Sequence, residues 1–252
     1  MSTKRKSTIH PDDEETNAII PSQKPINNSL TVKLTQLKNL EPLTDNQRIF
    51  YKNYDLSNYF MLNIGSAGTG KTLISCYKAI KEVLSKDNPF SQLVVVRSAV
   101  ATRDVGHLPG TLEEKTELYE LPYVETFRFL FNRHDAWQRL KEQGHCKFLT
   151  TTAIRGVTID DAIILVDESQ NMTWEEINTI MTRVGYRSKI IFCGDFKQND
   201  LVKQKNDTSG FMKFMTIAKS MPEFSFIEFT ADDILRSSLV KNWIIACEKS
   251  GN

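Results

Sequence analysis

The segment Gly65–Thr72, with the sequence Gly-Ser-Ala-Gly-Thr-Gly-Lys-Thr, most constrains what this chain can fold into. It matches the pattern Gly-x-x-x-x-Gly-Lys-Ser/Thr, whose glycines let the backbone curl so that N–H groups surround a phosphate. An apolar run of strand length, 59–64, precedes it, and apolar residues at helical spacing follow it. A strand, a glycine loop and a helix in this order aim the amino end of the helix at a bound anion. The segment therefore predicts a nucleotide-binding site in an α/β fold.

Each residue of this loop has an expected role in binding ATP with Mg²⁺. Lys71 can reach the β- and γ-phosphates, and the Thr72 hydroxyl can ligate the metal ion. Backbone N–H groups come from the rest of the loop, namely Gly65, Ser66, Ala67, Gly68, Thr69 and Gly70. A chance loop between two core elements is the alternative, and the agreement of the motif with its flanking segments disfavours it.

Length and composition agree with one large α/β domain or two small ones. The chain has 252 residues, and its apolar fraction of 40% is enough for a substantial core. The formal net charge of +1 excludes neither nucleic acid nor other partners. Four cysteines lie far apart without a Cys-x-x-Cys pair, which predicts free thiols in a reducing compartment. No apolar run reaches the length of a membrane span and there is no signal-peptide core, so we expect a soluble, cytoplasmic protein without a membrane partner.

Residues 1–28 are expected to form a disordered polar tail ahead of a folded domain at 29–252. A basic triplet, Lys4–Lys6, precedes the acidic cluster Asp12–Glu15, and prolines recur along the tail. Few residues of the tail can enter a core. The basic triplet either contacts a nucleic-acid backbone or, as we favour, is solvated.

Further strands are expected from the apolar runs at 92–97, 147–150, 162–166, 189–193 and 223–229. Continuous β-branched runs suit strands that are buried on both faces of a parallel sheet. The stretch at about 112–143, interrupted at Pro122, is too long for a simple crossover and is expected to be a helical insertion. Strands that alternate with helices predict a single doubly wound α/β domain with a mostly parallel sheet.

Polar side chains follow several of these strands at their carboxyl ends, where open α/β sheets place ligands. Asp167 can hold the water shell of Mg²⁺ opposite Thr72, and Glu168 can position and activate the attacking water. Arg97 follows the second strand, and Gln198 lies where an amide can contact the γ-phosphate. An ordinary strand that ends in solvated acids is the alternative to the metal assignment.

Two further assignments depend on position. Gln47, in a helix that begins at Thr44 or Asp45, lies before the loop where many helicase-like ATPases carry a glutamine that recognises adenine. An exposed helix glutamine is the alternative. Arg236, in a helix expected at about 231–246, is either a surface salt-bridge residue or an arginine finger for the γ-phosphate. Such a finger acts in its own subunit or in a neighbour's site.

With these features in order, the chain resembles the PhoH family of P-loop ATPases, from about Leu43 to Ile245. The resemblance rests on the phosphate loop together with later motifs. These are Arg97 with Gly106–Gly110, Glu114-Lys115, Pro122-Tyr123, Arg155-Gly156-x-Thr158, Asp167–Asn171, Thr182-Arg183-x-Gly185, Gly194-Asp195-x-x-Gln198 and Arg236. The chain departs from the family pattern at His107, where an aromatic residue is usual, and at Ser169, where alanine is usual. Neither departure removes a nucleotide ligand.

The resemblance implies a single RecA-like domain related to superfamily 1 helicases, and the compact chain is similar to bacteriophage members. It implies an ATPase that acts on single-stranded RNA or DNA, with RNA favoured, as a helicase or remodeller. Helicases close a cleft between two such domains, so one domain per chain implies a homo-oligomeric ring, hexameric by resemblance, in which Arg236 completes the site. A nucleotide-gated regulatory protein without unwinding activity is the alternative. A small-molecule kinase shares the loop but needs no water-activating acid.

Overall fold

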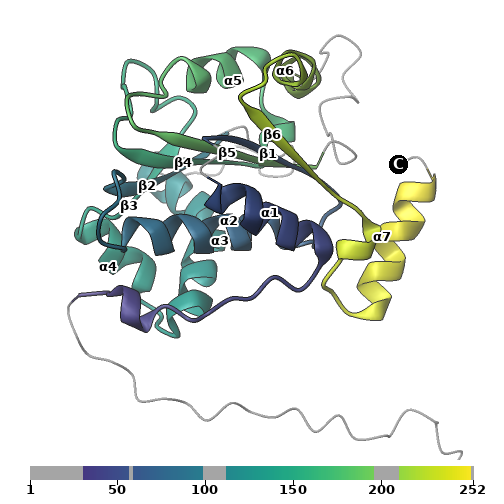
Figure 1. The fold of residues 1–252 in the computed structure, drawn as a ribbon, viewed down its shortest axis with the longest axis horizontal. Helices are drawn as coiled ribbons and strands as arrows, with labels where there is room; N and C mark the ends of the chain where they lie inside the picture. The colour runs from purple at the N-terminus through teal and green to yellow at the C-terminus, as the bar shows by residue number, and fades with distance from the viewer. Residues whose placement is uncertain (1–30, 57–58, 99–111, 196–209, 251–252) are drawn as a thin grey trace, which may run out of the picture.

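The computed structural model describes residues 31–56, 59–98, 112–195 and 210–250 (Figure 1). Within them, parallel strands form a six-stranded sheet in the spatial order β3-β2-β4-β5-β1-β6. The predicted tail and Gln198 lie outside the described residues. The prediction of an α/β fold with a doubly wound parallel sheet is confirmed. The strands are β1 (Phe60–Gly65), β2 (Gln92–Arg97), β3 (Cys146–Thr150), β4 (Ala162–Asp167), β5 (Lys189–Gly194) and β6 (Phe224–Phe229).

Helices cover both faces of the sheet (Figure 1). One face packs against α1 (Asp45–Asp55), α2 (Lys71–Val83), α3 (Leu112–Phe131) and α4 (Ala136–Glu142), and the other against α5 (Trp174–Met181) and α6 (Gly210–Lys219). The last helix, α7 (Ser238–Ser250), lies at the side of the molecule, beyond the end of β6. Short 3-10 turns occur at Leu34–Gln36, Ser169–Asn171 and Ala231–Asp233. Among the helices of the described ranges, none has the length and apolar character that crossing a membrane requires.

The central strands are buried on both faces because nearly all of their residues are apolar. Every residue of β4 and β5 is buried, and so are the last five residues of β1. Alternate side chains enter two separate cores, one under α1 to α4 and one under α5 and α6. This burial fixes the register of the strands, and with it the position of every side chain that follows a strand.

The segment between β2 and β3 forms α3 and α4, and α3 runs through Pro122. The interruption expected at Pro122 is therefore wrong. Proline removes one helical hydrogen bond, but the residues after it are held by tertiary packing. The Tyr123 ring centroid lies 6.0 Å from that of Trp137, and the Phe127 centroid lies 4.9 Å from the same ring. Packing of this kind supplies most of a helix's stability and outweighs the local propensity.

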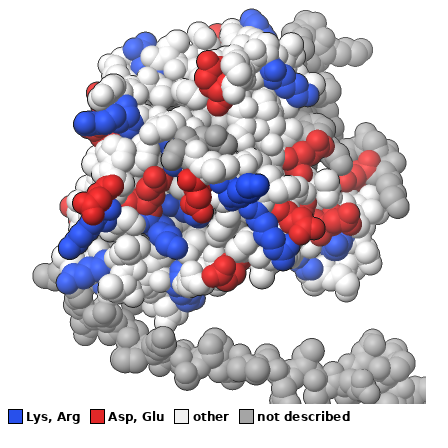
Figure 2. All heavy atoms as spheres, in the orientation of Figure 1, with Lys and Arg blue, Asp and Glu red and all other residues white. Residues whose placement is uncertain are grey.

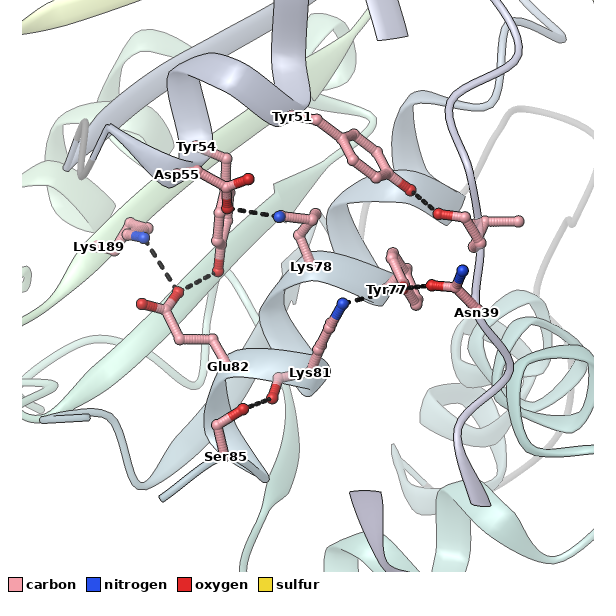
Figure 3. Close-up of polar contacts among 11 residues, drawn as sticks. Asn39, Tyr51, Tyr54, Asp55, Tyr77, Lys78, Lys81, Glu82, Ser85 and Lys189 are labelled. Carbon is pink, nitrogen blue, oxygen red and sulfur yellow. Dashed lines mark hydrogen bonds and ion pairs between the residues drawn. The ribbon is translucent and has the colours of Figure 1, made fainter. Parts of the chain in front are cut away.

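A buried polar cluster joins α1, α2 and the start of β5 (Figure 3). The Lys189 ammonium lies 3.0 Å from Glu82 Oε2 and 3.8 Å from the ring centroid of Tyr54. The Tyr54 hydroxyl donates to the same carboxylate oxygen at 2.5 Å. Burial lowers the pKa of Lys189, and the Glu82 carboxylate opposes this shift. A buried ammonium is costly without such partners, so the cluster fixes α1 and α2 at the amino edge of the sheet.

The carboxyl-terminal segment differs from the single helix expected at about 231–246. Its first residues form a 3-10 turn, and α7 begins only at Ser238. The backbone N–H of Leu235 donates to the Gly68 carbonyl at 3.0 Å, so it makes no intrahelical bond. Arg236 consequently lies in a bend beside the phosphate loop and not in a helix.

Candidate nucleotide-binding site

The carboxyl ends of β1, β2, β4 and β5 meet at one edge of the sheet and border a cavity of about 370 Å³. The parallel register aligns these ends, because Ile64 pairs with Gly194 and Arg97 pairs with Asp167. Motifs that are far apart in the sequence therefore meet in one place. The lining includes loop residues 67–72 together with Arg97, Asp167, Glu168, Gln170, Asp195 and Arg236.

The loop between β1 and α2 has a shape that depends on glycine. Gly65 has a φ of +123°, and a Cβ there would lie 1.8 Å from the Phe229 carbonyl oxygen, so a side chain does not fit beside β6. Gly70 has a φ of +83° and is the N-cap of α2. The first N–H groups of α2 have no intrahelical partners, and they lie at the cavity that Gly70, Lys71 and Thr72 line. These features fit an anion such as a phosphate.

The Lys71 ammonium is bound by the loop itself. Its Nζ donates to the carbonyl oxygens of Gly65 and Ser66, at 2.8 and 2.7 Å. Burial lowers the pKa of Lys71, while neighbouring groups, Cys193 and the Asp195 carboxylate first among them, raise it. The ammonium thus lies at the cavity, where its hydrogen bonds go to neutral carbonyl oxygens. Phosphate oxygens can take the place of these carbonyl oxygens, and because they are charged they form stronger hydrogen bonds.

The Thr72 hydroxyl and the Asp167 carboxylate lie side by side, as the metal assignment requires. Thr72 donates to Asp167 Oδ1 at 2.8 Å, and the buried Tyr123 hydroxyl donates to Oδ2 at 2.8 Å. Burial and the adjacent Glu168 raise the pKa of Asp167, whereas these two hydrogen bonds and the Arg97 charge lower it. An all-oxygen pair fits Mg²⁺, which uses one or two protein ligands together with phosphates. Within the described ranges, no group of three or more His, Cys, Asp or Glu residues forms a separate metal cage.

Glu168 follows Asp167 in a backbone conformation that is unusual for a residue with a side chain. Its φ of 53° and ψ of 39° are left-handed, which costs roughly 1–2 kcal/mol outside glycine. Gln170 Nε2 donates to Glu168 Oε2 at 2.7 Å, and Gln170 Oε1 accepts from the backbone N–H of Asp195 at 3.1 Å. Gln170 therefore joins the Glu168 carboxylate to the end of β5. Strained backbone held by such contacts is common at functional sites.

The carboxyl-terminal segment contacts the loop of its own chain. A Cβ built on Gly68 would lie 3.0 Å from Arg236 Cγ, and Arg236 lines the cavity. The Ser66 hydroxyl donates to Glu248 Oε1 on α7. With the bond from Leu235 to Gly68, the loop and this segment meet at three points. Arg236 thus lies beside the phosphate loop of its own subunit.

Gln47 is buried against the loop, so the alternative of an exposed helix residue is wrong. Its side chain is 2% exposed. Its Nε2 donates to the Thr69 carbonyl at 2.9 Å, and its Oε1 accepts from the backbone N–H of Leu43 at 2.8 Å. The amide therefore supports the loop directly. Recognition of adenine by Gln47 stays a prediction, as does the contact of Gln198 with the γ-phosphate.

Three features of the site carry no assigned role in the sequence analysis: Tyr123, Gln170 and the contact between Ser66 and Glu248. Tyr123 and Gln170 fall in motifs that support the family resemblance, which is the signal that marks them. The Ser66–Glu248 contact spans 182 positions of the chain and has no such signal.

A parallel sheet with a phosphate loop after β1 and two adjoining acids at the end of β4 defines a P-loop nucleoside triphosphatase fold. The comparison of the sequence with family models narrows this class. The model described as PhoH-like protein matches residues 39–248, and the chain belongs to that family.

Similar proteins come from several bacteria. The PhoH-like protein of Bacillus subtilis (strain 168) is 34% identical over 193 residues, which cover 76% of this chain and 59% of that protein. Protein PhoH of Escherichia coli (strain K12) is 29% identical over 192 residues, which cover 75% of this chain and 53% of that protein. The chain therefore spans little more than half the length of these relatives. Among solved structures, Pif1 helicase from Candida albicans aligns with a TM-score of 0.34 at 18% identity, over 76% of this chain and 41% of that one.

Proposed function

We propose that this chain binds ATP with Mg²⁺ at the carboxyl edge of the sheet and hydrolyses it. The observation that carries the proposal is that Lys71, the Thr72–Asp167 pair and Glu168 line one cavity. These groups supply a phosphate ligand, an oxygen pair for the metal and a carboxylate beside it. A kinase for small molecules needs no water-activating carboxylate at this place, which favours hydrolysis.

The proposed mechanism assigns one task to each group. The loop N–H groups and the Lys71 ammonium bind the phosphates, and Arg236 adds positive charge beside Gly68. Thr72 and Asp167 would hold the metal ion, which would neutralise charge on the phosphoryl oxygens. Glu168 orients the attacking water and accepts its proton.

Other residues keep these groups in position. Gln170 holds the Glu168 carboxylate through its 2.7 Å bond. We assign the γ-phosphate contact to Gln198. We assign recognition of the adenine edge to Gln47, in addition to its support of the loop.

We propose that hydrolysis is coupled to single-stranded nucleic acid, RNA or DNA, in a helicase or remodelling activity. Support for this proposal comes from membership of the PhoH-like family, and from the resemblance of that family to superfamily 1 helicases. On the face shown in Figure 2, the basic and acidic side chains of the described residues are interspersed, so these residues form no continuous basic surface for a strand on that face.

A nucleotide-gated regulatory protein without unwinding activity is the second candidate. The observation that favours it is the set of contacts between the loop and the segment that carries α7. A change in the loop on nucleotide binding can reach α7 through these contacts and alter a surface for a protein partner.

The steady-state rate of ATP hydrolysis distinguishes the two candidates. If hydrolysis is coupled to single strands, we expect a several-fold increase on adding single-stranded RNA or DNA, and a smaller one with duplexes. Glu168→Gln, measured in parallel, gives the background from contaminating enzymes. An unchanged rate with intact basal turnover would support the regulatory candidate and contradict the coupling to nucleic acid.

We also propose that the active form is a homo-oligomeric ring, a hexamer by family resemblance, because one domain supplies only one side of a closing cleft. Apolar side chains on α7 are unusually exposed, with Leu239 at 79% and Trp243 at 70%, as is common at protein interfaces. Static light scattering with a non-hydrolysable ATP analogue should give the mass of a hexamer. A monomer at every nucleotide concentration would remove the mechanism proposed for unwinding.

We place this activity in the cytoplasm. Three cysteines, Cys76, Cys146 and Cys193, are buried free thiols in the structure. Free buried thiols are typical of a reducing compartment, which supports this placement.

A further inference from the structure

The Tyr123 hydroxyl contacts the carboxylate that we assign to the metal ion. It donates to Asp167 Oδ2 at 2.8 Å, while Thr72 donates to Oδ1 at 2.8 Å. Both partners are buried, with Tyr123 at 0% and Asp167 at 5% exposure. Among the described residues, each oxygen of the carboxylate thus accepts from one side-chain hydroxyl, and the two donors together fix the plane of the carboxylate.

Tyr123 comes from the insertion between β2 and β3, and its ring is held independently of its hydroxyl. The ring centroid lies 6.0 Å from that of Trp137 on α4 and 5.8 Å from that of Phe148 on β3. On either side of Tyr123 in α3, Pro122 and Thr126 line the cavity. Aromatic packing therefore sets where the hydroxyl lies, and the hydroxyl sets where the carboxylate lies.

We propose that Tyr123 is a positioning residue for the metal site, a role that rests on the function proposed above. Its hydrogen bond keeps the Asp167 carboxylate beside the Thr72 hydroxyl. Without the second donor, the carboxylate can rotate about its Cβ–Cγ bond and leave this arrangement. Partners of this kind commonly change metal affinity by about 10- to 100-fold.

A purely structural role for Tyr123 leads to a different expectation. A buried hydroxyl requires an acceptor, and its removal costs some stability in either case. Only the positioning role links Tyr123 to the dependence of nucleotide binding on Mg²⁺. The informative measurement is therefore a Mg²⁺ titration of binding, without turnover.

Tyr123→Phe keeps the ring and removes the hydroxyl. Binding of a fluorescent, non-hydrolysable ATP analogue is measured across a Mg²⁺ titration, with the melting temperature at each point. We expect half-saturating Mg²⁺ to rise by about 10-fold, while affinity for the analogue without Mg²⁺ is unchanged. The matched control is Tyr51→Phe, which removes a hydroxyl that donates to the Leu40 carbonyl at 2.7 Å, outside the cavity lining. The control should leave half-saturating Mg²⁺ unchanged.

Two results would overturn the inference alone. One is a Tyr123→Phe variant with the half-saturating Mg²⁺ of the parent protein, which leaves the proposed function intact. The other is equal loss of analogue binding with and without Mg²⁺, together with a lowered melting temperature, which assigns Tyr123 to fold stability. If the parent protein itself binds the analogue without any Mg²⁺ dependence, the proposed function fails, and the inference fails with it.

Discussion

Glu168→Gln is expected to retain nucleotide binding and to lower the rate of ATP hydrolysis by about 10²- to 10⁴-fold, the usual contribution of a positioned general base. Glutamine has nearly the same shape, and its amide oxygen can still accept the hydrogen bond from Gln170 Nε2. The amide cannot accept a proton from water, however. Turnover measured at saturating ATP, together with titration of a non-hydrolysable analogue, separates the lost step from binding.

The matched control for this variant is Glu175→Gln. Glu175 is an exposed glutamate in the first turn of α5, outside the cavity lining. The control should leave turnover and binding unchanged. Parental turnover in Glu168→Gln would contradict the assignment of the base, and loss of analogue binding would indicate damage to the site as a whole.

Lys71→Ala is expected to weaken ATP binding by about 100-fold, because hydrogen bonds to charged groups contribute about 1.5–3 kcal/mol each. The change removes the only side-chain charge of the segment 65–72. It also removes one donor from the carbonyl oxygen of Gly65 and one from that of Ser66, which still accepts from the Thr69 hydroxyl. Titration with the fluorescent analogue gives the affinity, and turnover should fall at least as far.

Lys81→Ala is the control for the lysine substitution. Lys81 lies near the end of the same helix, α2, and its side chain is exposed. Its removal should change neither affinity nor turnover. If Lys71→Ala bound the analogue as tightly as the parent protein, the loop would not be the phosphate site, and the proposed function would lose its main support.

The sequence predicted location best for residues at or shortly after the end of a strand. The carboxyl ends of parallel strands share one edge, so Lys71 after β1 and Asp167 at the end of β4 could be assigned to one site before any distance was known. These strands could be predicted because each is an almost continuous run of apolar residues. Local patterns were sufficient here because the strand period and the sheet geometry fix where the ends of strands lie.

The contacts that the sequence did not predict depend on how helices pack. The hydroxyl of Tyr123 meets a carboxylate 44 positions away, through the packing of an inserted helix that no periodicity places. Pro122 lies inside that helix because aromatic contacts outweigh its local penalty. The bend at Arg236 likewise forms because a loop carbonyl takes the N–H of Leu235.

The attachment of the loop to the segment after β6 also bears on how small a working fragment can be. A fragment ending at Phe229 would contain the whole glycine-rich motif and both acids. It would nonetheless lack Arg236 from one wall of the cavity, and the carboxylate of Glu248 that holds Ser66. The minimal unit thus extends past the last strand to Glu248 on α7, and a truncation directly after β6 would remove part of the pocket.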